Sequence, residues 1–258
     1  MATVRELMSL EGRVSVVTGG ATGLGLQMAT GLAEAGSNIV VCSRRRENCE
    51  QAAAQLEALG VKALGLECDV TKPDQVEAVK DATLKRFGRV DVLVNNSGRA
   101  WVAPPEELPL ERWQQIMDLN ATAPFICSQI FGREMIKAKR GRIINIASIA
   151  GLQGRHPQAY SSIVYSTSKG ALVNFTRDLA VKWAQHNIHV NCICPGFFVT
   201  SINRKLFEKG AEKILSEIPL GRTGGENDLK GIVVLLASDA SNFMTGAIIP
   251  VDGGAIAW

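Results

Sequence analysis

Short apolar runs rich in valine and isoleucine recur along the chain, separated by longer stretches of helical character. Each run predicts a strand, and the expected strands are Val14–Val17, Asn38–Cys42, Lys62–Glu67, Val90–Val94, Arg142–Ala147, Ile188–Cys194 and Ala247–Val251. Strands that alternate with helices of about 10–15 residues form parallel sheets with helices on both faces. The pattern therefore predicts an α/β fold with a doubly wound parallel sheet of about seven strands.

Residues that start and stop helices bound the stretches between the strands. The expected helices are Gln27–Ala35, Glu47–Leu59, Pro73–Phe87, Glu111–Lys139, Val164–Gln185 and Asn227–Ala237. No linker, repeat or low-complexity segment divides the chain, so residues 1–258 are expected to form one domain. Residues 197–225 follow the sixth strand as an irregular or short-helical insertion, which predicts a mobile lid over a site.

The first strand runs into a glycine-rich turn, Thr18-Gly-Gly-Ala-Thr-Gly-Leu-Gly25, and a helix follows. Glycines permit a tight turn and close approach of the backbone, and the helix N-terminus offers N–H groups to a pyrophosphate. The spacing is Gly-x-x-x-Gly-x-Gly and not Gly-x-Gly-x-x-Gly. The turn favours nucleotide binding, and a plain tight connection is the alternative.

Ser43 and Arg44 follow the second strand, about 20 residues beyond the glycines, where an NAD site has Asp or Glu for the ribose 2′-OH. A guanidinium at this point pairs with a 2′-phosphate. Arg44 therefore favours NADP(H) over NAD(H), whereas Arg45 and Arg46 are expected only to solvate the next helix.

Asn120 and Pro124 interrupt the long helical stretch 111–139. Asparagine is unfavourable inside a helix, and a proline cannot donate to the carbonyl four residues before it. The carbonyl of Asn120 is thus left without its helical partner. A simple kink is one interpretation, and a carbonyl that holds a water is the other.

Tyr165 and Lys169 lie four residues apart, which places both side chains on one face of a helix. A free tyrosine has a pKa of ~10, and a nearby ammonium lowers it. The pair could therefore exchange a proton near neutral pH. Taken alone, the pair is more readily explained as an exposed Tyr and Lys on an ordinary helix, and it is the rest of the chain that favours the catalytic interpretation.

Composition excludes several classes of protein. Hydrophobic residues make up 46% of the chain, charged residues 21%, and the net charge is +3 without a long basic run, so nucleic acid is not an expected partner. No apolar stretch approaches the ~20 residues of a membrane span, and the start lacks a signal-peptide pattern, so a cytoplasmic protein is expected. No metal site is expected either, because the six scattered cysteines form no Cys-x-x-Cys pair: Cys42, Cys49, Cys68, Cys127, Cys192 and Cys194.

Together these motifs resemble the short-chain dehydrogenase/reductase family over nearly the whole chain. The matching pieces, in order, are Thr18–Gly25, Asp69, Asn95-Asn-Ser-Gly98, Asn120, Ser148, Tyr165-x-x-x-Lys169, Pro195-Gly196 and Thr200. The resemblance implies a Rossmann-type fold and an enzyme that interconverts a secondary alcohol and a ketone. It also implies a homotetramer, packed through the helices around 111–138 and 164–186.

The resemblance also implies a role for each matching residue. Tyr165 would be the general acid/base on the substrate oxygen, Ser148 would polarise that oxygen, and Lys169 would bind the nicotinamide ribose and lower the pKa of Tyr165. Asn120 would hold a water that links Lys169 to solvent. The cofactor-binding residues would be Gly19, Thr22, Gly23, Leu24, Gly25, Ser43, Arg44, Asp69, Val70, Asn96, Gly98, Tyr165, Lys169, Pro195, Gly196 and Thr200.

The chain departs from the family pattern at two places. Ser97 stands where alanine is usual, and Ser148 and Tyr165 are 17 positions apart, several more than usual. An insertion is therefore expected within 151–163. Tyr160 has Val164 and not a lysine at its fourth following position, so it is rejected as the base.

The substrate is chosen by the loops at the mouth of the site. Their candidate residues are Arg99, Trp101, Gln153, Arg155, His156, Phe198, Asn203, Arg204 and Lys205. If the cations face inward they favour an anionic small molecule. A sugar acid, as in gluconate 5-dehydrogenases, is preferred over an acyl chain on a carrier, as in 3-oxoacyl-carrier-protein reductases. A non-catalytic NADP-binding scaffold or sensor is the alternative from another class, which the intact set of four catalytic candidates disfavours.

Overall fold

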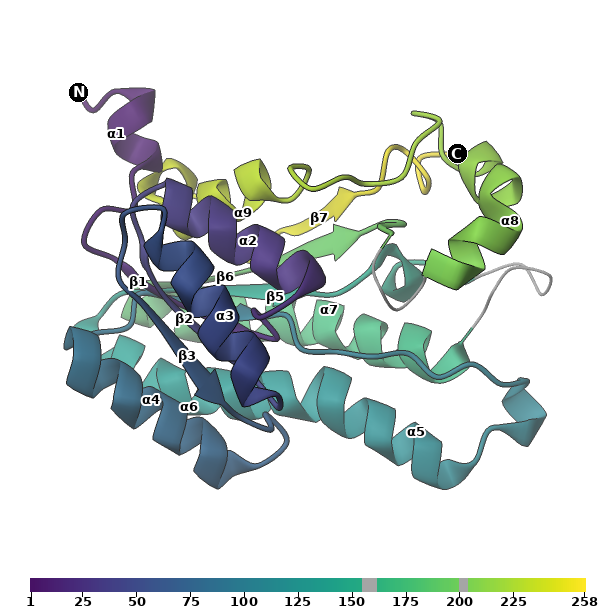
Figure 1. The fold of residues 1–258 in the computed structure, drawn as a ribbon, viewed down its shortest axis with the longest axis horizontal. Helices are drawn as coiled ribbons and strands as arrows, with labels where there is room; N and C mark the ends of the chain where they lie inside the picture. Colours follow the sequence, from purple (N-terminus) through teal and green to yellow (C-terminus); the bar gives the residue numbers. More distant parts are fainter. Residues whose placement is uncertain (155–161, 200–203) are drawn as a thin grey trace.

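Seven parallel strands form one sheet in the order β3-β2-β1-β4-β5-β6-β7 (Figure 1). The computed structural model describes residues 1–154, 162–199 and 204–258. The strands are β1 Val14–Thr18, β2 Asn38–Ser43, β3 Ala63–Glu67, β4 Val92–Asn95, β5 Gly141–Ile146, β6 Ile188–Pro195 and β7 Ile248–Val251. The predicted doubly wound α/β fold is confirmed, because every neighbouring pair of strands is parallel.

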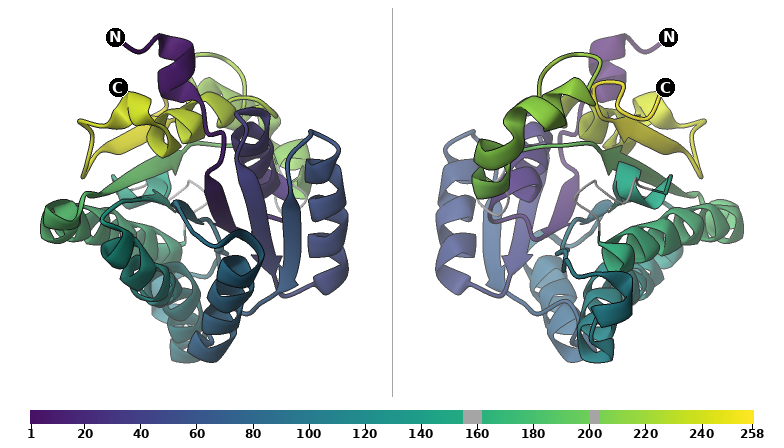
Figure 2. Two further views of the ribbon diagram at one scale, coloured as in Figure 1. Left: turned by 90° about the vertical axis from the view of Figure 1, so that its left-hand side faces the viewer. Right: turned by 90° about the vertical axis from the view of Figure 1, so that its right-hand side faces the viewer.

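Helices cover both faces of the sheet (Figure 2). Three of them, α2 Gly23–Glu34, α3 Arg46–Glu57 and α9 Lys230–Ala237, bury Leu32, Leu56 and Val233 in one apolar cluster. On the other face, α4 Pro73–Phe87, α6 Ala123–Ala138 and α7 Ile163–Trp183 build a second cluster around Phe131. Two cores divided by one sheet are what a doubly wound fold requires.

The stretch expected as one long helix contains a π-helical turn. It begins as α5 Leu110–Met117, passes through the π-helical turn Asp118–Thr122 and continues as α6. In this turn the N–H of Ala123 donates to the carbonyl of Asp118, five residues back. Because Pro124 has no N–H, the ladder cannot close on Asn120 in the usual way.

Several helical elements differ from the sequence expectations, and α2, for example, begins at Gly23 and not at Gln27. Residues 204–216, expected as irregular or short helix, form the 13-residue helix α8 Arg204–Ser216, with a non-helical backbone at Gly210. A mid-helix glycine lowers helix propensity, which hid this element. Helix α9 begins three residues later than expected, after a turn in which Lys230 donates to the carbonyl of Asn227 at 3.1 Å. A short helix, α1 Val4–Met8, was not anticipated at all.

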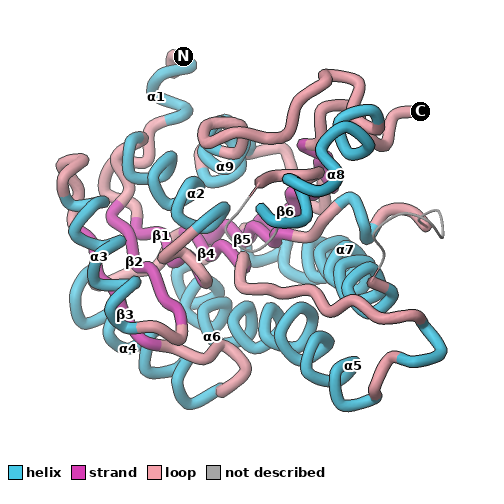
Figure 3. The backbone as a smooth tube through the Cα atoms, turned by 45° about the vertical axis from the view of Figure 1, so that its right-hand side comes forward, coloured by secondary structure: helices cyan, strands magenta, loops and turns pink. Residues whose placement is uncertain are grey.

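The order of the strands reverses between β1 and β4. From β1 the chain moves outward to β2 and β3, then crosses back to add β4 on the other side of β1. Ligands of such sheets bind at this switch point, outside the carboxyl ends of the strands. The long segment after β4 passes below α8 at this end of the molecule (Figure 3).

Candidate active site

A cavity of about 1320 Å³ opens at the carboxyl ends of the strands. It is lined by most of the residues singled out in the sequence: Gly19, Thr22, Gly23, Leu24, Gly25, Ser43, Arg44, Asp69, Val70, Asn96, Gly98, Ser148, Tyr165, Lys169, Pro195 and Gly196. Asn120 does not line the cavity and lies behind it, fully buried. Thr200 lies outside the described residues.

The turn after β1 has the shape that a dinucleotide needs. Gly19 has φ +63°, a left-handed conformation that favours glycine, and a Cβ on Gly25 would stand 2.2 Å from the carbonyl oxygen of Gly19. Thr22 precedes α2 with an extended backbone and makes no side-chain cap hydrogen bond. The N–H groups of the first turn of α2 therefore face a cavity that can take a pyrophosphate.

The far end of the cavity carries the residues expected around an adenosine. Ser43 and Arg44 contribute from the end of β2, and Asp69 and Val70 follow β3. Arg44 is exposed on this wall, and neither Arg45 nor Arg46 lines it. Arg46 instead pairs with Glu50 on α3 at 2.7 Å. Of the three consecutive arginines, Arg44 is therefore the one that lines the cavity.

Asn96 and Thr18 hold the loop after β4 against the glycine turn. The amide of Asn96 donates to the carbonyls of Thr18 and Gly19 at 3.0 and 3.1 Å. The hydroxyl of Thr18 accepts from the backbone N–H groups of Asn96 and Ser97 at 3.0 and 3.1 Å. These bonds keep the two loops of the switch point at a constant separation.

Tyr165 and Lys169 occupy the first two turns of α7. The amine of Lys169 lies 5.7 Å from the centre of the Tyr165 ring and donates to the carbonyl of Ile146 at 2.7 Å. Lys169 is 4% exposed, and burial lowers its pKa to about 8. The pair is therefore not an exposed couple on an ordinary surface helix.

Asn120 ties three elements together through its side chain. Its Oδ1 accepts from the N–H of Arg99 at 3.0 Å, and its Nδ2 donates to the carbonyl of Arg99 at 2.9 Å. Nδ2 also donates to the hydroxyl of Ser168 on α7 at 3.0 Å. The side chain thus fixes the loop after β4 and helix α7 relative to the π-helical turn.

Ser148 stands two residues beyond the end of β5. Its Oγ accepts from the N–H of Ala150 at 3.1 Å at the start of the short 3-10 turn Ile149–Gly151. As an acceptor in that bond, the hydroxyl can still donate its own proton into the cavity. The unusual spacing from Ser148 to Tyr165 leaves both residues on the same cavity, while residues 155–161 of the expected insertion lie outside the described part of the chain.

Sequence reasoning missed three supporting groups. The carbonyl of Ile146, which holds Lys169, has no sequence signal. Ser162 accepts from the N–H of Tyr165 at 3.3 Å and donates to the carbonyl of Trp101. Its place three residues before Tyr165 is an N-cap signal that could have been used. Thr18 was quoted only as part of the glycine motif, although its hydroxyl holds both loops.

The residues expected at the mouth are only partly brought together. Arg99 and Phe198 line the cavity, whereas Gln153 and Trp101 do not. The guanidinium carbon of Arg112 lies over the ring of Trp101, 4.3 Å from the ring centre. Arg155, His156 and Asn203 lie outside the described residues, as do the side chains of Arg204 and Lys205. The described lining also holds two carboxylates, Glu106 and Glu217, and several apolar side chains: Val102, Leu119, Ile149, Ile163, Phe197, Ile214 and Ile218.

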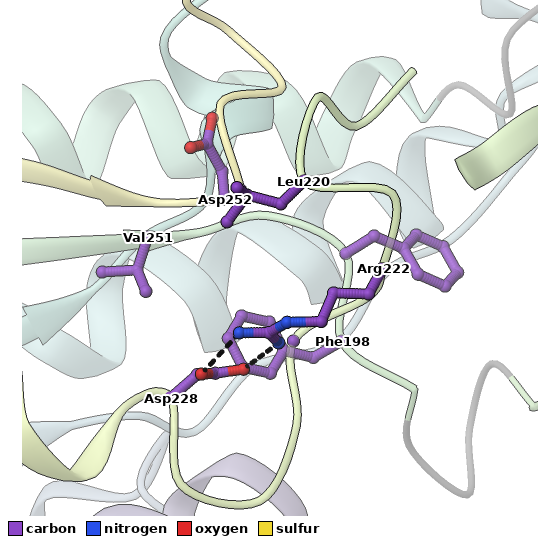
Figure 4. Close-up of a pocket in the computed structure, with 9 residues that line it drawn as sticks. Phe198, Leu220, Arg222, Asp228, Val251 and Asp252 are labelled. Carbon is purple, nitrogen blue, oxygen red and sulfur yellow. Dashed lines mark hydrogen bonds and ion pairs between the residues drawn. The ribbon is translucent and has the colours of Figure 1, made fainter. Parts of the chain in front are cut away.

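A second, smaller pocket of about 140 Å³ lies behind the loop that follows β6 (Figure 4). It shares Phe197 and Phe198 with the large cavity. On its wall Arg222 and Asp228 face each other with two hydrogen bonds, 2.6 and 3.1 Å long. None of the candidate catalytic residues lines this pocket, and its ion pair ties the segment after α8 to the turn before α9.

Within residues 1–154, 162–199 and 204–258, no group of three or more His, Cys, Asp or Glu side chains is placed to hold a metal. All six cysteines are buried free thiols. No helix in the described part of the chain combines the length and apolar character needed to cross a bilayer.

A glycine-rich first turn, a parallel sheet with its switch point beside that turn, and a half-buried Tyr165 next to a buried Lys169 define a Rossmann-type oxidoreductase. The chain belongs to the short chain dehydrogenase family, whose model matches residues 13–211. The resemblance noted from the motifs is thereby confirmed, and the protein is an oxidoreductase of alcohols and carbonyls.

Relatives with established names divide between two substrate classes. The chain is 41% identical to a 2-dehydro-3-deoxy-D-gluconate 5-dehydrogenase of Escherichia coli, over 98% of this chain and 99% of the relative. It is 34% identical to a 3-oxoacyl-[acyl-carrier-protein] reductase of Thermotoga maritima, over 96% and 100%. A gluconate 5-dehydrogenase from Burkholderia cenocepacia, solved with NADP and tartrate, superposes with a TM-score of 0.93 at 34% identity, covering 99% and 100%.

Proposed function

We propose that this protein is an NADP(H)-dependent oxidoreductase that interconverts a secondary alcohol and a ketone on a sugar acid. The observation that carries the proposal is that the half-buried Tyr165 and the buried Lys169 share one cavity with Ser148 and the glycine turn. The bound nicotinamide supplies or receives the hydride. The chain's own residues orient the substrate and move the proton.

Tyr165 is the acid or base on the substrate oxygen. The ammonium of Lys169, 5.7 Å from the ring centre, favours the phenolate and lowers the pKa of Tyr165 toward neutrality. The hydroxyl of Ser148 donates to the same substrate oxygen and stabilises charge that develops on it. The carbonyl of Asn120, which Pro124 leaves without its helical donor, holds a water through which Lys169 exchanges protons with solvent.

The cofactor lies along the cavity from the adenosine end to Tyr165. The first turn of α2 binds the pyrophosphate, and Asp69 and Val70 contact the adenine. Arg44 binds the 2′-phosphate, which accounts for NADP(H) over NAD(H). Several structural relatives were solved with NADP, among them the gluconate 5-dehydrogenase described above.

A sugar acid is the proposed substrate because several of the named relatives act on gluconate or its keto derivatives. Arg99 supplies a guanidinium beside the reaction centre for the substrate's carboxylate. Its backbone is held on both sides by the amide of Asn120, and a Cβ on the preceding Gly98 would lie 3.3 Å from the amine of Lys169.

An acyl thioester is the second candidate, and a specific observation favours it. The described wall on the substrate side is mostly apolar, with Ile149, Ile163 and Ile214 among its members. An apolar wall suits an alkyl chain better than a polyhydroxylated one. Two similar proteins named as 3-oxoacyl-carrier-protein reductases support this second candidate.

Helix α8 is proposed as the lid. The cavity is lined by Gly210 and Ile214 of α8 and by Glu217, which directly follows the helix. The non-helical backbone at Gly210 gives the helix a hinge point. Closure of α8 would exclude water from the substrate carbonyl.

The test is a screen of the purified protein that follows nicotinamide absorbance. The panel is 5-ketogluconate, an acetoacetyl thioester and a neutral diketone, each with NADPH and with NADH. Turnover of ketogluconate with NADPH supports the proposal. Turnover of the thioester alone moves the protein to the acyl class, and NADPH binding without turnover of any ketone revives the scaffold alternative.

A further inference from the structure

Ser168 is the buried polar residue between the two ends of the Tyr165-x-x-x-Lys169 motif. It has no exposed surface, whereas the preceding Thr167 is exposed. The hydroxyl of Ser168 accepts from the Nδ2 of Asn120 at 3.0 Å and donates to the carbonyl of Tyr165 at 2.8 Å. One side chain therefore connects the π-helical turn to the residue that bears the catalytic phenol.

Both N–H donors of the Asn120 amide are used in this arrangement. Its oxygen accepts from Arg99, one N–H donates to the carbonyl of Arg99, and the other donates to Ser168. Asn120 is fully buried, so losing the Ser168 oxygen would leave a donor without a partner in the protein interior. The Asn120 amide would then rotate to find another acceptor for this N–H, and the π-helical turn would shift with it.

The bond from Ser168 to the carbonyl of Tyr165 acts on the helix itself. A serine that donates to a carbonyl in the preceding turn tilts that carbonyl and bends the helix locally. At this position the bend orients the turn that carries both Tyr165 and Lys169. The two hydrogen bonds of Ser168 thus form a continuous link from the Asn120 amide to the backbone of Tyr165.

We propose that Ser168 is a positioning residue that keeps the Tyr165 phenol and the Lys169 amine in register with the carbonyl of Asn120. This proposal rests on the proposed function, because it assigns Ser168 a role only through Tyr165. If the hydrogen bonds of Ser168 served only to pair buried polar groups, its replacement would affect stability alone. A positioning serine also affects the ionisation of Tyr165, because the effect of an ammonium on a phenol depends on their separation.

The structure offers a matched control in the same helix. Thr176 is also fully buried, donates from its hydroxyl to the carbonyl of Leu172 at 2.8 Å and accepts from the Nδ2 of Asn145 at 2.9 Å. It repeats the bonding of Ser168 two turns further along α7, away from the cavity. Thr176→Ala therefore measures the structural effect alone, and Thr167→Ala measures the effect of an exposed change in the catalytic turn.

The experiment compares Ser168→Ala with these two variants. For Ser168→Ala we expect kcat to fall about ten-fold, with the Kd of NADPH changed less than about two-fold, and the pH profile of alcohol oxidation to move upward by about half a unit to one unit. Thr176→Ala should lower Tm without moving the profile, and Thr167→Ala should change neither. Ser168→Cys, which keeps the volume but bonds weakly, repeats the measurement should Ser168→Ala fail to fold.

Two results would overturn the positioning role. One is a wild-type kcat and pH profile in a folded Ser168 variant, and the other is an equal shift of the profile in Thr176→Ala. Tyr165→Phe is measured beside them. Retained turnover in Tyr165→Phe overturns the proposed function itself, whereas lost turnover there with unchanged Ser168 variants overturns only the role of Ser168.

Discussion

Lys169 is a buried cation whose described neighbours include a backbone carbonyl and the sulfur atoms of Cys192 and Cys194. Within the described part of the chain no carboxylate is among the groups that shift its pKa, so burial dominates and lowers that pKa to about 8. A charge kept in such a place is not there for stability, because desolvation opposes it. We propose that it acts on Tyr165 and on a bound ribose.

The burial of Lys169 predicts a pH dependence of stability. Between pH 8 and about 10.5 the unfolded lysine holds a proton that the folded lysine has lost, so raising the pH favours the folded state in that window. The free energy of unfolding of the cofactor-free protein, relative to Lys169→Met, should therefore rise by ~2 kcal/mol from pH 7 to 9.5. Denaturant titrations of both proteins measure it, and parallel curves would contradict the assigned burial.

Arg44 predicts the cofactor preference. Arg44→Gln removes a charge-assisted bond to the 2′-phosphate, so the KM of NADPH should rise about 10- to 100-fold while that of NADH stays within about two-fold. Steady-state kinetics with both cofactors measure this. Arg45→Gln is the matched control, because Arg45 does not line the cavity. An equal rise of the NADPH KM in both variants would contradict the assignment of Arg44 to the cofactor site.

Among the helices and strands, the sequence predicted best those features that depend on glycine or proline, because each of these residues restricts or frees the backbone in a known way. Gly88, with φ +74°, ends α4, and Pro73 opens it as expected. Pro124 correctly marked an irregularity at Asn120, although only the structure showed a π-helical turn. Contacts between distant segments, such as Lys169 with Ile146 and Ser168 with Asn120, leave no local pattern and could not be predicted. Helix α8 was underestimated because Gly210 interrupts its propensity.

The π-helical turn gives a prediction at this scale. Pro124→Ala restores an N–H that can donate to the carbonyl of Asn120 and draw the turn into a regular α-helix. We expect kcat to fall roughly ten-fold while Tm is unchanged or raised, because the carbonyl is withdrawn from its water. Activity and thermal unfolding measured together test this. Pro73→Ala, at the start of α4 and outside the lining of the cavity, is the proline control. Full activity in Pro124→Ala would mean that the freed carbonyl has no role.

For the whole molecule, the surface formed by α5, α6 and α7 carries exposed apolar side chains. Leu110, Phe125 and Val181 are among them, and Phe125 meets Phe175 edge to face at 6.3 Å. We propose that this surface packs against other copies of the chain in a homotetramer. Size-exclusion chromatography with light scattering should give the mass of four chains, and Phe125→Glu should lower that mass. A monomer at micromolar concentration would refute the proposal.

Tyr165 is the proposed acid or base, and its hydroxyl can be removed with little change in shape. The measurement is the reduction of the best ketone from the screen by NADPH, with wild type and with Tyr165→Phe, beside the Kd of NADPH for each. We predict that kcat falls by about 10²–10⁴-fold while the Kd changes less than about two-fold, because the proton donor is lost but the cofactor site remains. A Tyr165→Phe protein within ten-fold of wild-type kcat would contradict the role of Tyr165 as the acid or base.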